Sequence, residues 1–139
     1  MWKTEYSVES KASEESIWKV MTDVENWKKW VSGLEYSRLD SDFGNGVFGT
    51  LKNFNGPKSR FWIKDVIENK SFIMQSKFML CAMDGIHEIT NENGLIKIKL
   101  GVRICGPLTF ILKYFARNTE KSLPIAAKKL SELAEMVRK

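Results

Sequence analysis

The sequence lacks the features that would place the protein in a membrane or export it. No stretch reaches the roughly 18 consecutive apolar residues of a transmembrane helix, and the first residues lack the basic-then-apolar order of a secretory signal. Internal repeats, low-complexity tracts and linkers are also missing. A chain of 139 residues can bury one core but has no room for a second. We therefore expect a cytoplasmic protein, without stable membrane insertion, that folds as a single domain over residues 1–139.

Cysteine and histidine are too scarce to form the usual metal or thiol sites. Cys81 and Cys105 are the only cysteines, and neither belongs to a CxxC pair or to a cluster with His and carboxylates at metal-ligand spacing. His87 is the only histidine, and the sequence offers no obvious partner that would orient it as a catalytic base. We expect two reduced, half-buried cysteines and neither a metal nor another cofactor.

Charge is plentiful but is not concentrated. Lys and Arg number 22 against 17 Asp and Glu, which gives a formal net charge of +5. The lysines are scattered along the chain, and basic residues are not interleaved with aromatic residues on one strand face. This pattern argues against nucleic-acid binding and supports at most a weak attraction to anionic lipid or phosphate.

Residues 1–33 predict one strand followed by two short helices. Apolar and polar residues alternate over residues 2–9, as in a strand with one wet face. Ser13 is a good helix N-cap, with two acidic residues in the first turn, and this helix is expected to end near Thr22. Asp23 is expected to cap a second short turn that runs to Trp27, before Gly33 breaks the run.

Residues 34–104 predict a series of strands, and the remainder of the chain predicts one long helix. Hairpin signals at residues 44–46, 55–57, 68–70 and 91–94 separate the strands. The clearest strand covers residues 95–104, where apolar residues alternate with Lys, Gly and Arg. After Pro107, apolar residues recur at steps of three and four, and Pro124 is expected to kink this amphipathic helix.

The order of these elements and one segment carry a resemblance to a known superfamily. Residues 16–34, SIWKVMTDVENWKKWVSGL, place Trp18, Asp23, Trp27 and Trp30 in a helix, a second helix and the mouth of the sheet. This arrangement resembles the START and polyketide cyclase superfamily (SRPBCC), which includes the birch-pollen-allergen proteins. The resemblance covers the whole chain and implies an α+β helix-grip fold. A curved antiparallel sheet of about seven strands would wrap around the long C-terminal helix, with two short helices after the first strand.

The resemblance also implies a cavity between the sheet and the C-terminal helix. In that superfamily the cavity accepts lipids, sterols, polyketides, quinones or plant hormones. We expect this protein to bind or transport a small hydrophobic ligand, such as a lipid, a polyketide or a quinone-like molecule, as a monomer or weak homodimer and with weak catalysis or none. The alternatives are a polyketide cyclase/dehydratase-like or hydrolase-like enzyme that uses the same cavity, and a partner protein in chaperone action or quinone delivery.

The residues expected to line this cavity come from the apolar faces of the strands and of the long helix. They are Trp30, Phe48, Phe61, Ile63, Asp65, Met74, Phe78, His87, Ile98, Leu100, Leu108, Ile111, Leu112, Phe115 and Thr119. One or two polar groups among Asp65, His87 and Arg103 are expected to orient the ligand.

Several of these residues also fit a purely structural role. Asp65 shares its face with Ile63, which places it inside unless a one-residue bulge turns it toward solvent. His87 shares its parity with Ile89 and faces inward, or it is a satisfied or exposed histidine. The three tryptophans of residues 16–34 line a pocket entrance or seal the short helices against the sheet.

Two further features are expected to border the cavity. Phe110 and Tyr114 lie off the main stripe of the long helix, so its first turns are apolar on more than one side. We expect them to support a lid, and a dimer contact or a membrane-facing patch is the alternative. The segment DFGNGVFGT, with Gly44, Gly46 and Gly49, has neither the trailing Lys nor the strand-to-helix context of a phosphate loop. The resemblance implies instead that their loop borders the cavity mouth.

Overall fold

The computed structural model describes residues 2–54, 56, 58–78, 81–107 and 109–137, and it describes their side chains except at 78 and 109–119. The elements are, in chain order, β1 (Trp2–Ser10), α1 (Glu14–Met21), the 3-10 helix η1 (Val24–Lys29), β2 (Leu34–Leu39), β3 (Phe48–Asn53), β4 (Lys58–Ile67), β5 (Ser71–Phe78), β6 (Cys81–Glu92), β7 (Leu95–Cys105) and α2 (Thr109–Met136). Over the described residues, no helix combines the length and the apolar composition that crossing a membrane requires.

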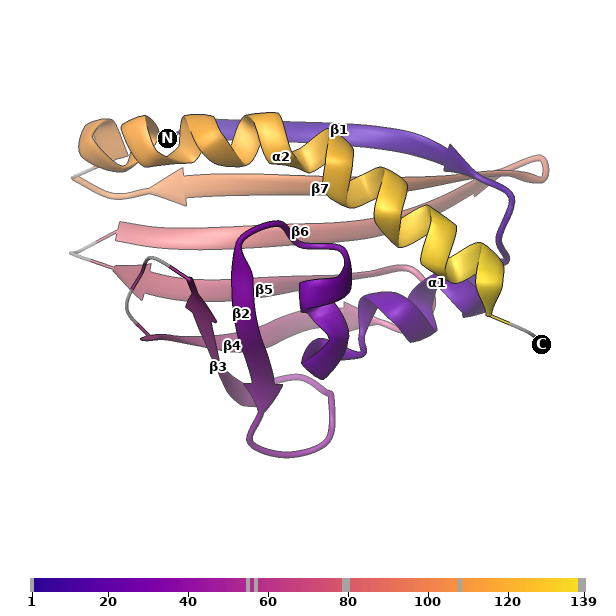
Figure 1. Cartoon of the computed structure of the whole chain (residues 1–139), viewed down its shortest axis with the longest axis horizontal. Coiled ribbons are helices and arrows are strands. Elements are labelled where there is room, and N and C mark those ends of the chain that lie inside the picture. Colours follow the sequence, from indigo (N-terminus) through magenta and orange to yellow (C-terminus); the bar gives the residue numbers. More distant parts are fainter. Residues whose placement is uncertain (1, 55, 57, 79–80, 108, 138–139) are drawn as a thin grey trace.

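The strands form one curved antiparallel sheet around α2. Within the described part of the chain the sheet has seven strands, in the order β1-β7-β6-β5-β4-β3-β2. Figure 1 shows α2 lying along β1 and β7, while β2 and β3 are set across the long strands at the other side. The two short helices, α1 and η1, connect β1 to β2, and α1 packs against α2. The predicted α+β helix-grip fold is therefore confirmed.

The strict alternation of inward and outward side chains explains why β1 pairs with β7 along its whole length. Every second residue of β1 is half-buried and the residues between them are exposed, as the sequence pattern predicts. Tyr6 lies opposite Leu100, and Val8 lies opposite Ile98, so their apolar faces coincide in the paired strands. A one-residue slip would move all of these side chains to the wet face. The register is fixed by burial.

The start of α1 is capped as expected, whereas the start of η1 is not. The Ser13 hydroxyl accepts a hydrogen bond from the backbone N–H of Ser16 at 3.1 Å. Asp23 occupies the N-cap position of η1, but its side chain makes no cap hydrogen bond. It accepts instead from the side-chain amide of Asn26 at 2.7 Å. The predicted side-chain cap at Asp23 is wrong because Asn26 competes for the same carboxylate.

The C-terminal half of α2 closes one end of the core. Ala127, Leu130 and Ala134 are fully buried on its inner stripe, three and four residues apart, as the helical periodicity predicts. They belong to the same apolar cluster as Ile17 of α1 and Ile98 of β7. Figure 1 shows that α2 bends part-way along its length, and Pro124 lies inside the helix. The bend agrees with the predicted kink.

Two residues predicted to face the interior lie on the outer surface instead. The pairing of β4 with β5 shifts between Lys64 and Ile67, and Asp65 adopts a positive φ of 53° at this bulge. The bulge turns the Asp65 carboxylate toward solvent. Phe48 is 48% exposed because it pairs with Trp62 on the outer face, where the two rings lie 5.7 Å apart. The cavity placement predicted for both residues is wrong, whereas the alternative for Asp65, a one-residue bulge that turns it toward solvent, is confirmed.

Candidate ligand-binding cavity

A cavity of about 750 Å³ lies between the concave face of the sheet, the η1–β2 connection and the middle of α2. Most of its wall is apolar, with a few polar groups. The described residues that line it are Trp27, Trp30, Val31, Ser32, Gly33, Leu34, Leu51, Asn53, Phe54, Gly56, Met74, Met83, Gly85, His87, Leu100, Gly101, Val102, Ser122, Leu123 and Ala126.

The cavity lies at the level where both the sheet and α2 carry small residues on their facing sides. Gly85 of β6 lies opposite Met74 of β5 on one side and Val102 of β7 on the other, so a row of inward side chains is interrupted there. On α2 the wall is formed in part by Ala126, which is also small. Since neither residue can fill the space between the layers, a hollow remains at this level.

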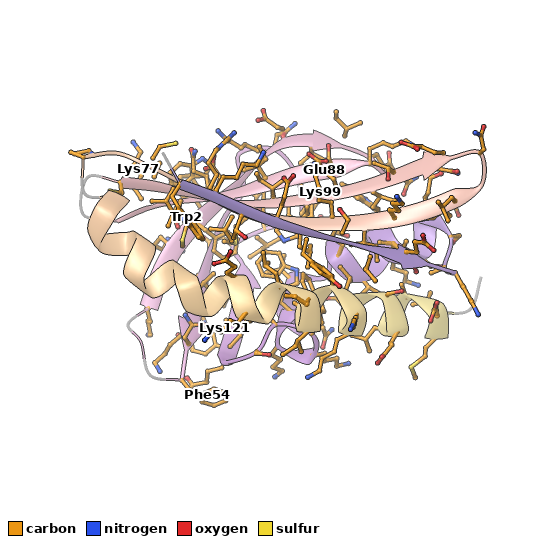
Figure 2. The ribbon with its side chains drawn as sticks, turned by 90° about the horizontal axis from the view of Figure 1, so that it is seen from above. Trp2, Phe54, Lys77, Glu88, Lys99 and Lys121 are labelled. Atoms are coloured by element: carbon orange, nitrogen blue, oxygen red, sulfur yellow. The ribbon has the colours of Figure 1, made fainter. Side chains whose placement is uncertain are left out.

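The cavity opens to solvent between the η1–β2 connection and the end of β3. Ser32 and Gly33 are exposed at this rim, and Phe54 is 63% exposed. The backbone N–H of Phe54 donates to the Gly33 carbonyl at 3.0 Å, which joins the two segments of the rim. Figure 2 shows Phe54 projecting away from the body of the protein. A large aromatic side chain therefore stands at the mouth without being packed.

His87 is held in the cavity wall by parallel aromatic rings. Its imidazole stacks on Phe72 with centroids 4.3 Å apart and on Trp27 with centroids 5.9 Å apart, at interplanar angles of 7° and 14°. Its Nδ1 lies 3.2 Å from the Gly85 carbonyl oxygen. A carbonyl can only accept, so Nδ1 carries the hydrogen and Nε2 keeps its lone pair. Burial lowers the pKa of His87 to about 4, against a smaller opposing effect of the Gly85 hydrogen bond. The ring is neutral at pH 7.

The two tryptophans of the wall differ in their hydrogen bonding. Trp27 donates from Nε1 to the Met21 carbonyl at 2.9 Å, which ties η1 to α1. Trp30 is 3% exposed, and its buried Nε1 has no hydrogen-bond partner. The Trp30 ring lies nearly perpendicular to the His87 ring, at 84°, with centroids 6.2 Å apart. Trp18, by contrast, packs its ring against Phe72 and not against the cavity, so it seals α1 to the sheet.

The described wall of the cavity carries no Asp, Glu, Lys or Arg. Arg103, proposed as a ligand-orienting group, lies on the opposite face of β7, where it donates to Asp84. Asp84 is 5% exposed and also accepts from the Gln75 side chain at 2.6 Å. This pair raises the pKa of Arg103 above its usual value, first through the hydrogen bond to Asp84. The prediction that Arg103 reaches the ligand is wrong because its charge is used on the outer face.

The predicted site residues fall into four groups. Trp30, Met74, His87 and Leu100 line the cavity. Phe61, Ile63 and Ile98 are fully buried in the core beside it. Phe48 and Asp65 are exposed, as described above. The side chains of Phe78, Ile111, Leu112, Phe115 and Thr119, and the whole of Leu108, lie outside the described residues, as do the side chains of Phe110 and Tyr114 proposed for a lid.

Sequence reasoning missed part of the wall although a signal was present. Met83 and Gly85 share the parity of His87, and Val102 shares that of Leu100, so alternation alone places them on the same face. Leu123 and Ala126 belong to the predicted stripe of α2. No such signal marks the rim, because Ser32 and Asn53 come from irregular or terminal positions that the fold brings together.

The loop after β2 does not border this cavity. Its residues 41–43 line a separate, smaller pocket of about 320 Å³ with residues 22–25 and Leu39. The N–H of Gly46 donates to the Ile63 carbonyl at 2.7 Å, which draws the loop against β4. The role at the cavity mouth that the resemblance implied for Gly44 and Gly46 is therefore wrong. Among the described residues, no three His, Cys, Asp or Glu side chains gather as a metal site requires.

Comparison with known proteins shows a likeness in structure. No family model and no curated protein matches the chain. The solved structure of norcoclaurine synthase from Thalictrum flavum matches with a TM-score of 0.75 and 15% identity, over 99% of this chain and 95% of that one. The Mesorhizobium loti protein MLL2253 matches with a TM-score of 0.75 and 12% identity, over 99% and 100% of the two chains.

A di-domain protein provides the third comparison. The ARO/CYC protein StfQ of the steffimycin biosynthetic pathway matches with a TM-score of 0.75 and 10% identity, over 96% of this chain. This chain spans 50% of StfQ's length. At such identities the likeness concerns the fold. The chain has the helix-grip fold of the ARO/CYC protein StfQ and of norcoclaurine synthase, as the resemblance to the START and polyketide cyclase superfamily predicted.

Proposed function

We propose that the protein binds a small hydrophobic molecule, such as a lipid, a polyketide or a quinone-like compound, between the sheet and α2. The observation that carries this proposal is the cavity of about 750 Å³, with a mostly apolar wall and an open rim. Pockets for small ligands commonly measure roughly 300–1,000 Å³ and combine apolar walls with a few polar groups. Transfer of an apolar molecule from water into such a space is favourable.

Binding fits the cavity better than catalysis does. A cyclase-like or hydrolase-like reaction needs a group that accepts a proton near neutral pH. His87 is the titratable group in the described wall, and its pKa of about 4 makes it a weak base at pH 7. Asp65, a carboxylate expected to orient the ligand, is on the outer surface. The enzymatic alternative is retained because His87 presents an unprotonated nitrogen and because some proteins of this fold are named as synthases and cyclases.

The proposal is tested with an uncharged probe and with a variant that fills the cavity. Nile red should bind saturably to the purified protein, and native mass spectrometry of freshly isolated protein should show a lipid-like adduct. Ala126→Phe places a ring in the hollow, because Ala126 lines it, and should lower Nile red affinity about tenfold or more. Lys128→Phe is the matched control, since Lys128 is exposed on the same helix.

The outcomes separate clearly. Circular dichroism must first show that both variants keep the wild-type fold. Equal binding by Ala126→Phe and the wild type would place the dye elsewhere and contradict the proposed site. Absence of both a saturable dye signal and a copurified ligand would contradict the binding role itself. Turnover of a polyketide-like substrate that is lost in His87→Phe, without unfolding, would favour the enzymatic alternative instead.

A further inference from the structure

An unused hydrogen-bond donor lies in the cavity wall. Among the described residues, Nε1 of Trp30 is the buried side-chain nitrogen or oxygen that lacks a hydrogen-bond partner. Trp30 is 97% buried and belongs to the wall. The neighbouring Trp27 shows the ordinary situation, since its Nε1 donates to the Met21 carbonyl. Buried donors are almost always paired, so an unpaired donor on a side chain that lines a ligand-sized cavity calls for an acceptor.

A hydrogen-bond acceptor lies on a neighbouring side chain of the wall. The Trp30 and His87 rings lie nearly perpendicular to each other, at 84°, with centroids 6.2 Å apart. Because Nδ1 of His87 donates to the Gly85 carbonyl, Nε2 carries the lone pair. The stacked rings of Phe72 and Trp27 hold the imidazole in this orientation. The wall therefore offers one N–H donor and one nitrogen acceptor on adjoining side chains. A hydroxyl group is the simplest uncharged partner that can accept from the first and donate to the second.

The described wall gives no compensation for a charged ligand. It contains no Asp, Glu, Lys or Arg. The buried carboxylate of Asp84 and the half-buried guanidinium of Arg103 neutralise each other on the opposite face of the sheet. A carboxylate or an ammonium group that entered the cavity would lose its hydration without gaining a counter-ion, which strongly disfavours binding. Burial also holds the His87 pKa far below neutrality, so this ring does not supply a positive charge.

We propose that Trp30 and His87 bind the oxygen of an uncharged, hydroxyl-bearing ring compound, and that the cavity rejects a carboxylate of the same shape. The ring follows from the wall around the two polar groups. Trp27 adds an aromatic surface, and Met74 and Met83 add thioethers, which contact aromatic rings favourably. This inference rests on the proposed function, because it assigns the chemical class of ligand to the same cavity.

Three probes that share one fused ring test the inference. Equilibrium dialysis at pH 7 compares 2-naphthol, which is uncharged, with naphthalene, which lacks the oxygen, and 2-naphthoate, which is an anion. The protein should bind 2-naphthol about tenfold more tightly than either of the other two. Trp30→Phe should reduce 2-naphthol affinity about tenfold, to the level of naphthalene, while naphthalene affinity stays unchanged. His87→Phe should have the same selective effect.

Trp62→Phe is the control variant, because Trp62 packs on Phe48 at the outer face. It should bind all three probes as the wild type does. The inference is overturned if 2-naphthol and naphthalene bind equally, if Trp30→Phe keeps the preference, or if 2-naphthoate binds as tightly as 2-naphthol. Each of these results leaves the binding role intact. A failure of both 2-naphthol and naphthalene to bind at all would instead contradict the proposed function.

Discussion

Acidification from pH 7.5 to pH 5 should destabilise the protein by about 2 kcal/mol through His87. This residue is the only histidine of the chain, and burial lowers its pKa to about 4. In the unfolded chain the ring binds a proton as the pH falls through about 6.5, whereas in the folded protein it stays neutral until about pH 4. The unfolded state thus binds more protons between these values, so stability is lost as the pH falls.

The assay is urea unfolding at several pH values between 5 and 7.5, followed by far-UV circular dichroism. His87→Phe keeps an aromatic ring between Phe72 and Trp27 and removes the titrating nitrogen, so its stability should change much less over this range. Glu14→Gln is a second control. Its carboxylate has a pKa lowered mainly by the Lys70 hydrogen bond, so it titrates below the range and should keep the wild-type slope. Equal pH dependence in His87→Phe and the wild type would refute the reasoning.

Three substitutions test the packing by denaturant unfolding. Gly49→Ala should cost about 2 kcal/mol, because the added carbon would lie 2.5 Å from the Arg38 carbonyl, whereas Gly44→Ala, with open space around it, should be nearly neutral. Ser13→Ala should cost about 1 kcal/mol by removing the cap of α1; no loss would mean that water replaces the cap. Arg103→Met should cost about 2 kcal/mol by leaving Asp84 buried without its cation, and adding Asp84→Asn should recover part of this loss.

The parts of the fold that follow from local periodicity could be predicted from the sequence. β1 and β7 alternate so regularly that their inner faces are readable residue by residue, and burial follows the pattern. The apolar stripe of α2 could be predicted equally well, since Leu130 and Ala134 fall on the predicted buried face. In both cases the signal is carried by neighbours in the chain, and no tertiary information is needed.

The residue pattern alone could not decide where local irregularities occur, because they depend on the backbone conformation of single residues. β4 contains a bulge at Asp65, a residue type that tolerates the left-handed region, and this one feature reverses the direction of the carboxylate. At Phe48 the strand is short and flanked by glycine, so parity was not readable from the sequence. Its pairing with Trp62, fourteen positions away, decides which face it occupies.

The polar groups of the site could be predicted only in part, for a different reason. Parity placed His87 inside, but its stacking partner Trp27 comes from η1, and nothing in either segment specifies that the two rings are parallel. The sequence also cannot predict that Trp30 Nε1 lacks a hydrogen-bond partner, because this depends on the positions of all the atoms that surround the indole. Such features arise from contacts between segments far apart in the chain.

Two packing defects, an unfilled space and an unpaired donor, occur together at the cavity. At one end of the sheet, Ile98 and Leu130 are fully buried and the layers meet. Toward the middle of α2, Gly85 and Ala126 leave a hollow, and Trp30 keeps a donor without an acceptor. An open hollow forgoes apolar burial and an unpaired donor costs stability. A sequence that kept tight packing throughout would replace Gly85 and Ala126 by larger residues. A ligand that fills the hollow and supplies an acceptor would explain both the small residues Gly85 and Ala126 and the unpaired donor of Trp30.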